Sequence, residues 1–200
     1  PTLATQTLRA WWRRRPPAEA GPAGGPRALR WPDTFTNHFS PRAGQAAVQV
    51  LEEAGYRVEL PDRPLCCGLT WISTGQLDTA KRVLRRTVDH LAPLVESPPG
   101  PGGGGRGTPL VGLEPSCLAV LRHDALELLG ADDPAVVAVA RAASTLAEVL
   151  GGTSGWRPPD LGGMAVVVQP HCHQHAVLGW EADRDLLARA GAEVTAVGGC

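Results

Sequence analysis

The stretch Tyr56-Arg57-Val58-Glu59-Leu60-Pro61-Asp62-Arg63-Pro64-Leu65-Cys66-Cys67-Gly68 decides the fold class of this chain. Residues 56–60 are typical of a β-strand, and two adjacent cysteines and a glycine follow them after a short loop. Apolar side chains then recur at helical spacing across residues 76–94. The chain therefore passes from a strand through a cysteine-bearing loop into a helix.

The same succession extends in both directions from this stretch. Upstream, residues 28–31 predict a short strand, and Ser40-Pro41 supplies an N-cap and a first-turn proline for a helix that Gly55 ends. Downstream, the expected elements are a strand at 110–113, a helix from Cys117 to about residue 129, a helix at 133–150, a strand at 164–168, a helix at 171–190 and a strand at 193–197.

Strands that alternate with helices predict a parallel sheet with helices on both faces, and right-handed crossovers place all strand carboxyl ends at one edge. We therefore expect an α/β fold made of two Rossmann-like lobes, with parallel sheets flanked by helices. Each of the five cysteines, Cys66, Cys67, Cys117, Cys172 and Cys200, follows a predicted strand. We expect these cysteines at the carboxyl edge of the strands, where open α/β sheets bind their ligands.

Composition narrows the class of protein. The chain has 200 residues, of which 43% are hydrophobic, and a formal net charge of −1, so we expect a soluble globular protein without bulk affinity for nucleic acid. No apolar run is long enough to cross a membrane, and the start lacks the apolar core of a secretory signal. The sequence has no dinucleotide-binding or phosphate-binding glycine motif and no Gly-x-Ser-x-Gly turn.

Two segments are predicted to lie outside the core. Residues 1–27 are expected to be a flexible linker, and their basic cluster, residues 11–15, is expected to be solvated rather than bound to an acidic membrane or nucleic acid. Residues 97–108 are rich in proline and glycine and predict a second flexible loop. The start at Pro1 and the stop at Cys200 lead us to expect a piece of a longer polypeptide.

The five cysteines suggest a metal site. Near one of them, Glu114 is expected to orient the turn that carries Cys117. Five cysteines cannot all pair within one chain, and neighbours such as Cys66 and Cys67 close a disulfide ring only with strain, so we expect reduced thiols in a cytoplasmic location. Thiolates are the usual ligands of iron–sulfur clusters and of zinc. His171 and His173 flank Cys172 and offer further nitrogen donors. Three interpretations stay open, namely a [4Fe–4S] cluster, zinc, and small buried side chains in a metal-free domain.

Four motifs together resemble a known family. They are Pro32-Asp33-Thr34-Phe35-Thr36-Asn37-His38-Phe39, Leu65-Cys66-Cys67-Gly68, Gly112-Leu113-Glu114-Pro115-Ser116-Cys117 and His171-Cys172-His173-Gln174. They resemble the cysteine-rich CCG domain that heterodisulfide reductase shares with the iron–sulfur subunits of glycolate, lactate and glycerol-3-phosphate dehydrogenases. The resemblance is greatest to the C-terminal iron–sulfur region of FAD-linked oxidases of the D-lactate dehydrogenase type, and it covers about residues 28–200.

The family's pattern is a lone cysteine, then Cys-Cys-Gly, then a last cysteine, and it usually occurs twice. The resemblance implies a first repeat lobe in residues 28–130 and a truncated second lobe in residues 131–200, where Cys172 is the lone cysteine and Cys200 begins Cys-Cys-Gly. In the first repeat, Thr34 stands at the place of the lone cysteine. We expect the five cysteines to converge on one cofactor, with His171 or His173 as an additional donor.

The resemblance implies a function and partners. The implied function is an iron–sulfur electron-transfer domain of an FAD-dependent dehydrogenase of 2-hydroxy acids such as D-lactate or glycolate, without catalytic activity of its own. FAD is then expected in another domain of the parent protein, with FAD-binding and ferredoxin-like domains and an electron acceptor as partners. The implied location is cytoplasmic, or peripheral at the inner face of the membrane. The alternative is a structural or docking lobe that binds zinc or no metal.

Overall fold

A four-stranded parallel sheet forms the centre of the structure, a computed structural model that describes residues 2–16, 24–96 and 107–198. The strands are β1 (Arg27–Arg30), β2 (Arg57–Glu59), β3 (Leu110–Gly112) and β4 (Ala143–Thr145), in the order β2-β1-β3-β4. Ala28 pairs with Val58, Leu29 with Leu110, and Val111 with Ser144. The two central strands are nearly all buried, as expected for a parallel sheet with both faces covered.

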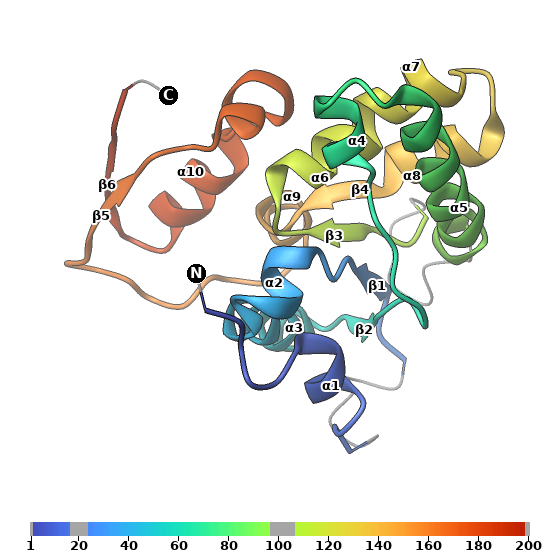
Figure 1. Cartoon of the computed structure of the whole chain (residues 1–200). Coiled ribbons are helices and arrows are strands. Elements are labelled where there is room, and N and C mark those ends of the chain that lie inside the picture. Colours follow the sequence, from blue (N-terminus) through green and yellow to red (C-terminus); the bar gives the residue numbers. More distant parts are fainter. Residues whose placement is uncertain (1, 17–23, 97–106, 199–200) are drawn as a thin grey trace.

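Helices cover both faces because successive strand residues point to opposite sides. Leu29 and Leu110 pack in one core cluster with helices α5, α6, α7 and α8, whereas Ala28, Val58 and Val111 pack in a second cluster with α3 and α9. In Figure 1, α5 and α8 lie to the upper right of the strands, and α1 and α3 lie below them. The helices of this part are α1 (Leu8–Trp12), α2 (Thr34–His38), α3 (Pro41–Glu53), α4 (Leu69–Ser73), α5 (Leu77–Glu96), α6 (Pro115–Ala119), the π-helical turn η2 (Val120–Asp124), α7 (Ala125–Leu129), α8 (Pro134–Ala142) and α9 (Leu146–Gly151).

A second, two-stranded parallel sheet stands to one side of the first (Figure 1). It pairs β5 (Ala165–Val168) with β6 (Glu193–Ala196), and the crossover between them contains the π-helical turn η3 (Gln174–Leu178) and α10 (Glu181–Arg189). The turn η3 contacts α6, and α10 contacts α9. The predicted α/β class with parallel sheets flanked by helices is confirmed.

The prediction of one helix over residues 133–150 is wrong. The chain forms α8, then the short strand β4 beside β3, and then α9. Thr145 ends the strand and caps α9, because its side chain accepts from the Glu148 amide while the Glu148 carboxylate accepts from the Thr145 amide. This Thr-x-x-Glu capping box is visible in the sequence and marks a helix start at residue 146.

The expected helix over residues 171–190 is also interrupted. It divides into η3 and α10 at Gly179, whose φ of +78° lies in the left-handed region and therefore breaks the helical backbone. The other predicted strands and helices are present with ends shifted by a few residues.

Part of the predicted linker belongs to the core. Residues 8–12 form α1, and Thr7 caps it by accepting from the Ala10 amide. Leu8 is fully buried and lies against α3, where a Cβ on Gly44 would come within 2.6 Å of the leucine side chain. Residues 17–23, and residues 97–106 of the predicted glycine-rich loop, lie outside the described residues. The division into lobes at residue 131 stays a prediction, and β4 and α9 pack with the first sheet.

Candidate thiol site at the carboxyl edge of the sheet

Cys66 and Cys67 lie in the loop between β2 and α4, and the loop is fixed by its glycine and by α5. Gly68 has a φ of +86°, a conformation that only glycine adopts without strain, and it leads directly into α4. The Thr87 hydroxyl of α5 donates to the Cys66 carbonyl oxygen at 2.8 Å. The Cys-Cys-Gly motif is therefore a tight turn held against the neighbouring helix.

Cys117 comes from the other side of the site, in the first turn of α6 after β3. The Glu114 carboxylate accepts from the Ser116 amide at 3.0 Å, in keeping with the expectation that Glu114 orients this turn. Helix α6 lies close to β3, since a Cβ on Gly112 would come within 2.6 Å of the Leu118 side chain. The position of Cys117 is thus set by a helix packed directly on its own strand.

These two elements bring thiols together. The Cys67 sulfur lies 3.1 Å from the Cys117 sulfur, although the residues are 50 positions apart. The Cys66 thiol forms a hydrogen bond with Cys67 and accepts from the Gly68 amide at 3.5 Å. Cys67 is only 4% exposed, Cys117 is half-buried and Cys66 is exposed. Three of the predicted cysteines therefore form a continuous group at the carboxyl edge of the sheet.

Hydrogen bonds between the thiols raise their pKa values. The bond to Cys117 is the main cause that raises the pKa of Cys67 to about 12, and burial adds to it. The pKa of Cys66 is also raised, first by its bond to Cys67 and then by burial. Both side chains are neutral thiols at pH 7, so a metal that binds them must displace their protons.

The second half of the predicted site lies in the smaller sheet. Cys172 is exposed just before η3, and no hydrogen bond joins it to the other three cysteines of the described chain. His171 and His173 stack with their ring centroids 5.4 Å apart, and the His173 amide donates to His171 Nδ1 at 3.2 Å. The buried His173 Nδ1 has no hydrogen-bond partner among the described residues. Cys200 lies outside them.

The donor chemistry fits a metal or cluster only in part. Three clustered thiols are the right donors for iron or zinc. In residues 2–16, 24–96 and 107–198, however, no group of three or more His, Cys, Asp or Glu side chains is arranged to hold a metal ion. Thr34, at the place of the family's lone cysteine, is exposed at the start of α2 and supplies no thiol. The convergence of all five cysteines on one cofactor stays a prediction.

Sequence reasoning missed a buried charged group at the end of β1. The Arg30 guanidinium is fully buried, lies 3.8 Å from the Asp33 carboxylate, and donates to the Thr36 hydroxyl at 3.1 Å. Burial lowers the pKa of Arg30 to about 10, and the Asp33 charge opposes this effect. Asp33 also accepts from the Thr36 amide and hydroxyl, and so caps α2. An arginine within an apolar strand was the available signal.

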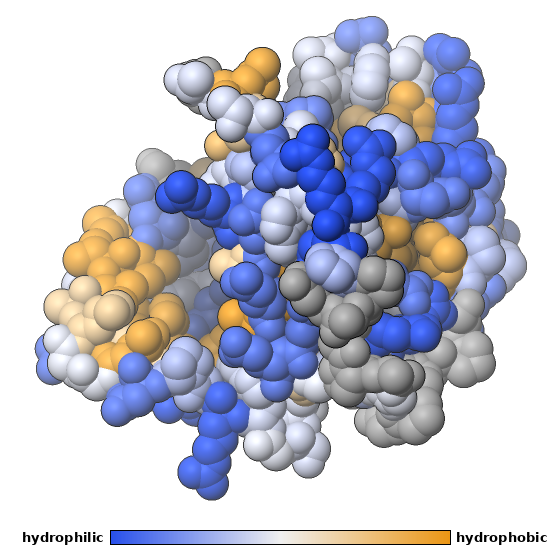
Figure 2. All heavy atoms as spheres, turned by 90° about the horizontal axis from the view of Figure 1, so that it is seen from below, coloured by the Kyte–Doolittle hydropathy of each residue, from blue (hydrophilic) through white to orange (hydrophobic). Residues whose placement is uncertain are grey.

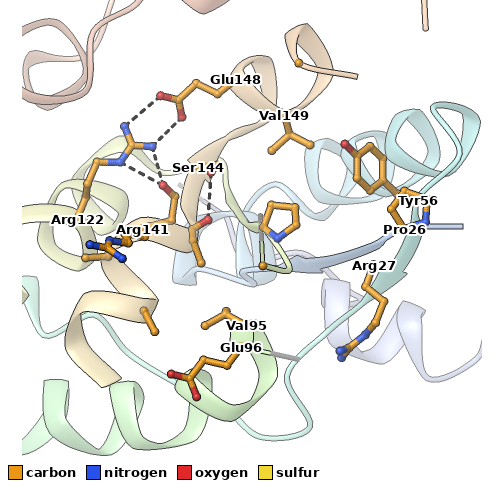
Figure 3. A pocket seen from close by; sticks show the side chains of 17 residues that line it. Pro26, Arg27, Tyr56, Val95, Glu96, Arg122, Arg141, Ser144, Glu148 and Val149 are labelled. Carbon is orange, nitrogen blue, oxygen red and sulfur yellow. Dashed lines mark hydrogen bonds and ion pairs between the residues drawn. The ribbon is translucent and has the colours of Figure 1, made fainter. Parts of the chain in front are cut away.

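A cavity of about 1300 Å³ lies at the opposite edge of the sheet (Figure 3). It is lined by residues at the amino ends of the strands, among them Pro26, Tyr56 and Ala143. Arg122 spans one wall, where it donates to the Ala143 carbonyl at 2.6 Å and pairs with Glu148 at 2.7 Å. None of the described residues that line it is a cysteine, so this cavity is separate from the thiol group.

Comparisons with known proteins find partial similarity to subunits of redox enzymes. One subunit of the fumarate reductase (CoM/CoB) of Methanothermobacter marburgensis is 44% identical over 52 residues, which are 26% of this chain and 11% of that protein. One subunit of the anaerobic glycerol-3-phosphate dehydrogenase of Escherichia coli is 27% identical over 99 residues, or 50% of this chain and 23% of that protein. Lactate utilization protein A of Bacillus licheniformis is 33% identical over 64 residues, which are 31% of this chain and 27% of that protein.

The chain is therefore a distant, partial homologue of these proteins, two of which are subunits of redox enzymes by name. The matches cover roughly a tenth to a quarter of the length of these relatives. No family model and no solved structure matches the chain. Among the described helices, none combines the length and apolar character that are needed to span a bilayer.

Proposed function

We propose that this chain is an iron–sulfur electron-transfer domain of an FAD-dependent 2-hydroxy-acid dehydrogenase. The observation that carries the proposal is the thiol group Cys66, Cys67 and Cys117, which gathers at the carboxyl edge of a parallel sheet from elements far apart in the sequence. The partial homology to subunits of a fumarate reductase and a glycerol-3-phosphate dehydrogenase supports the same chemistry.

The proposed cluster has named protein ligands. Cys66, Cys67 and Cys117 supply three thiolates, and Cys172 and Cys200 are proposed to complete the set, with His171 or His173 as a donor to metal or to cluster sulfur. The contact between η3 and α6 supports this arrangement, because η3 begins two residues after Cys172 and Cys117 lies within α6. A bound cluster would supply one-electron transfer, and the protein would position it and exclude water from its buried side.

Partners follow from this role. An electron-transfer domain needs a donor and an acceptor, so we propose a flavin domain and ferredoxin-like clusters, in the same or a partner chain, on the donor side. The name of the lactate utilization protein supports a hydroxy acid as the ultimate electron source. The proposed location is the cytoplasm, or the inner face of the membrane through a partner.

A structural or docking lobe with zinc or no metal is the second candidate. It is favoured by the exposed Thr34 at the lone-cysteine position and by the lack of a metal-binding group of three or more side chains in the described residues. A docking lobe requires no acid-labile sulfide, and this difference separates the two functions by chemical analysis.

The test is the content of iron, acid-labile sulfide and zinc in the chain purified without oxygen. The proposal expects about four irons and four sulfides per chain, together with visible absorbance from the cluster. Cys67→Ser should remove most of the iron and the absorbance, because Cys67 contacts both other thiols of the group. His175→Ala, at an exposed position, is the matched control and should retain both. Zinc or no metal in the wild type, or full absorbance in Cys67→Ser, would refute the assignment.

A further inference from the structure

Cys67 and Cys117 are placed for a reaction that needs no bound metal. Their sulfurs are 3.1 Å apart and are not joined by a disulfide. A disulfide bond is about 2.05 Å long, so the two sulfurs need to approach by only about 1 Å to form one. The turn that carries Cys67 is held by Gly68 and by the hydrogen bond from the Thr87 hydroxyl to the Cys66 carbonyl oxygen. Cys117 is held by the capped helix α6. Two hydrogen-bonded elements from different parts of the chain therefore bring the two thiols together.

The other possible partners of these sulfurs are less suitable. Cys66 and Cys67 are sequence neighbours, and a disulfide between neighbours closes a strained ring. Cys172 has no hydrogen bond to the group within the described residues. The thiols of Cys67 and Cys117 differ in their access to solvent, because Cys117 is half-buried while Cys67 is only 4% exposed. A reagent from solution reaches Cys117 before it reaches Cys67.

We propose that Cys67 and Cys117 are a redox-active dithiol that small-molecule disulfides, such as oxidised glutathione, convert to an intramolecular disulfide. The Cys117 thiolate attacks one sulfur of the reagent and expels the first small thiolate. The neutral Cys67 thiol then gives its proton to the expelled small thiolate, and the Cys67 sulfur attacks the Cys117 sulfur of the mixed disulfide and expels the second small thiolate. The protein loses two electrons and two protons, and one small disulfide becomes two small thiols.

The disulfide has a consequence for the thiol site. The disulfide contains two of the three clustered sulfurs, so in the oxidised chain these two cannot bind iron or zinc as thiolates. Oxidation thereby controls the loading of the site, and reduction by a dithiol restores it. The pairing rests on the geometry of the thiols, whereas the control of loading rests on the proposed function.

The pairing is tested on the full chain, freed of metal and fully reduced, and then treated with oxidised glutathione. Peptide mapping without reductant should link the Cys67 and Cys117 peptides, and the linked pair should be lighter by two hydrogen atoms than the two reduced peptides. Cys66→Ser and Cys172→Ser should still form this link, whereas Cys117→Ser should not. A bridge between other cysteines, or glutathione adducts without the internal link, would overturn the proposal.

A second measurement does not depend on how the variants fold. In the oxidised wild type, Cys67 and Cys117 should be protected from alkylation by iodoacetamide, while Cys66 and Cys172 should react. Alkylation of Cys117 to the same extent as in the reduced chain would also overturn the pairing.

Metal uptake then tests the consequence. The oxidised chain should take up little iron and sulfide until a dithiol reductant is added, and equal uptake by the two forms would overturn the control of loading. If even the reduced chain takes up neither iron nor sulfide, the proposed function fails, while the mapped disulfide still decides the pairing.

Discussion

Individual ionic groups stabilise this fold to very different extents. Arg30 and Asp33 place opposite charges inside the protein, where loss of one partner would leave the other buried and uncompensated. Glu59 lies at the surface end of β2, where it pairs with Arg27 at 2.7 Å and with Arg57 at 3.0 Å. Its side chain is 36% exposed, so solvent weakens these pairs to less than about 1 kcal/mol.

Glu59 gives a pH-dependent prediction. The hydrogen bond from Arg27 is the main cause that lowers the pKa of Glu59 from its ordinary value of 4.5. A carboxylate whose pKa is lowered on folding stabilises the protein above its unfolded pKa, and this contribution is lost as the pH falls through the folded pKa. The melting temperature of the wild type should therefore fall more steeply below about pH 4.5 than that of Glu59→Gln. Glu53→Gln, at an exposed position on α3, is the control, and equal slopes for Glu59→Gln and wild type would contradict the prediction.

At the scale of elements, the contact between β3 and α6 positions the candidate site. Strand β3 ends at Gly112, the chain turns through Glu114, and α6 returns over the strand with Leu118 against the glycine. The absence of a side chain at residue 112 allows this close approach. Cys117 precedes Leu118, so its distance from Cys67 depends on how closely the helix packs.

Gly112→Ala should therefore damage both stability and the thiol contact. The new Cβ would come within 2.6 Å of the Leu118 side chain, and overpacking of this kind costs about 1–3 kcal/mol. We expect a lower melting temperature and faster alkylation of Cys117 in the reduced chain. Gly151→Ala, where an added Cβ meets nothing within 4 Å, should show neither effect. Equal melting temperatures for the two variants would mean that Leu118 can move aside without cost.

At the scale of the whole molecule, the two sheets differ in how fully they are covered. The four-stranded sheet has a core cluster on each face, whereas α10 and the strands β5 and β6 contain no buried residue. Val167 is 72% exposed, and Met164 and Val197 are about half-exposed. Figure 2 displays this apolar surface as the orange area at its left edge, over the smaller sheet. An isolated pair of strands gains little stability from burial.

Amide hydrogen exchange should reflect this difference. Sheets open with a free energy that depends on the apolar surface they bury, so amides in β5 and β6 should exchange at least about tenfold faster than those in β1 and β3. Hydrogen exchange with mass spectrometry of the reduced chain measures both regions in one experiment, and β4, which pairs with β3, is the internal control. Similar protection in all strands would show that the smaller sheet is as cooperative as the larger one.

The sequence predicted the α/β class and most of the elements because apolar periodicity and helix-start signals are local. It located Cys66, Cys67 and Cys117 after strands, and the parallel topology then accounts for their shared edge. It missed β4, because Ala143-Ser144-Thr145 has no β-propensity that outweighs the helical pattern around it. Pairing with β3, a tertiary contact, decides that segment.

The sequence alone therefore determined which thiols are available and that each follows a strand. Both are local properties, because a strand is predicted from the residues next to one another in the chain. Only the tertiary structure decided which donors meet. The contact between Cys67 and Cys117 spans 50 positions and depends on the packing of α6 against β3 and of the Cys-Cys-Gly turn against α5. The burial of Arg30 beside Asp33 likewise follows from the covering of β1 on both faces. Close packing of distant segments sets such distances, and no local pattern of residues encodes them.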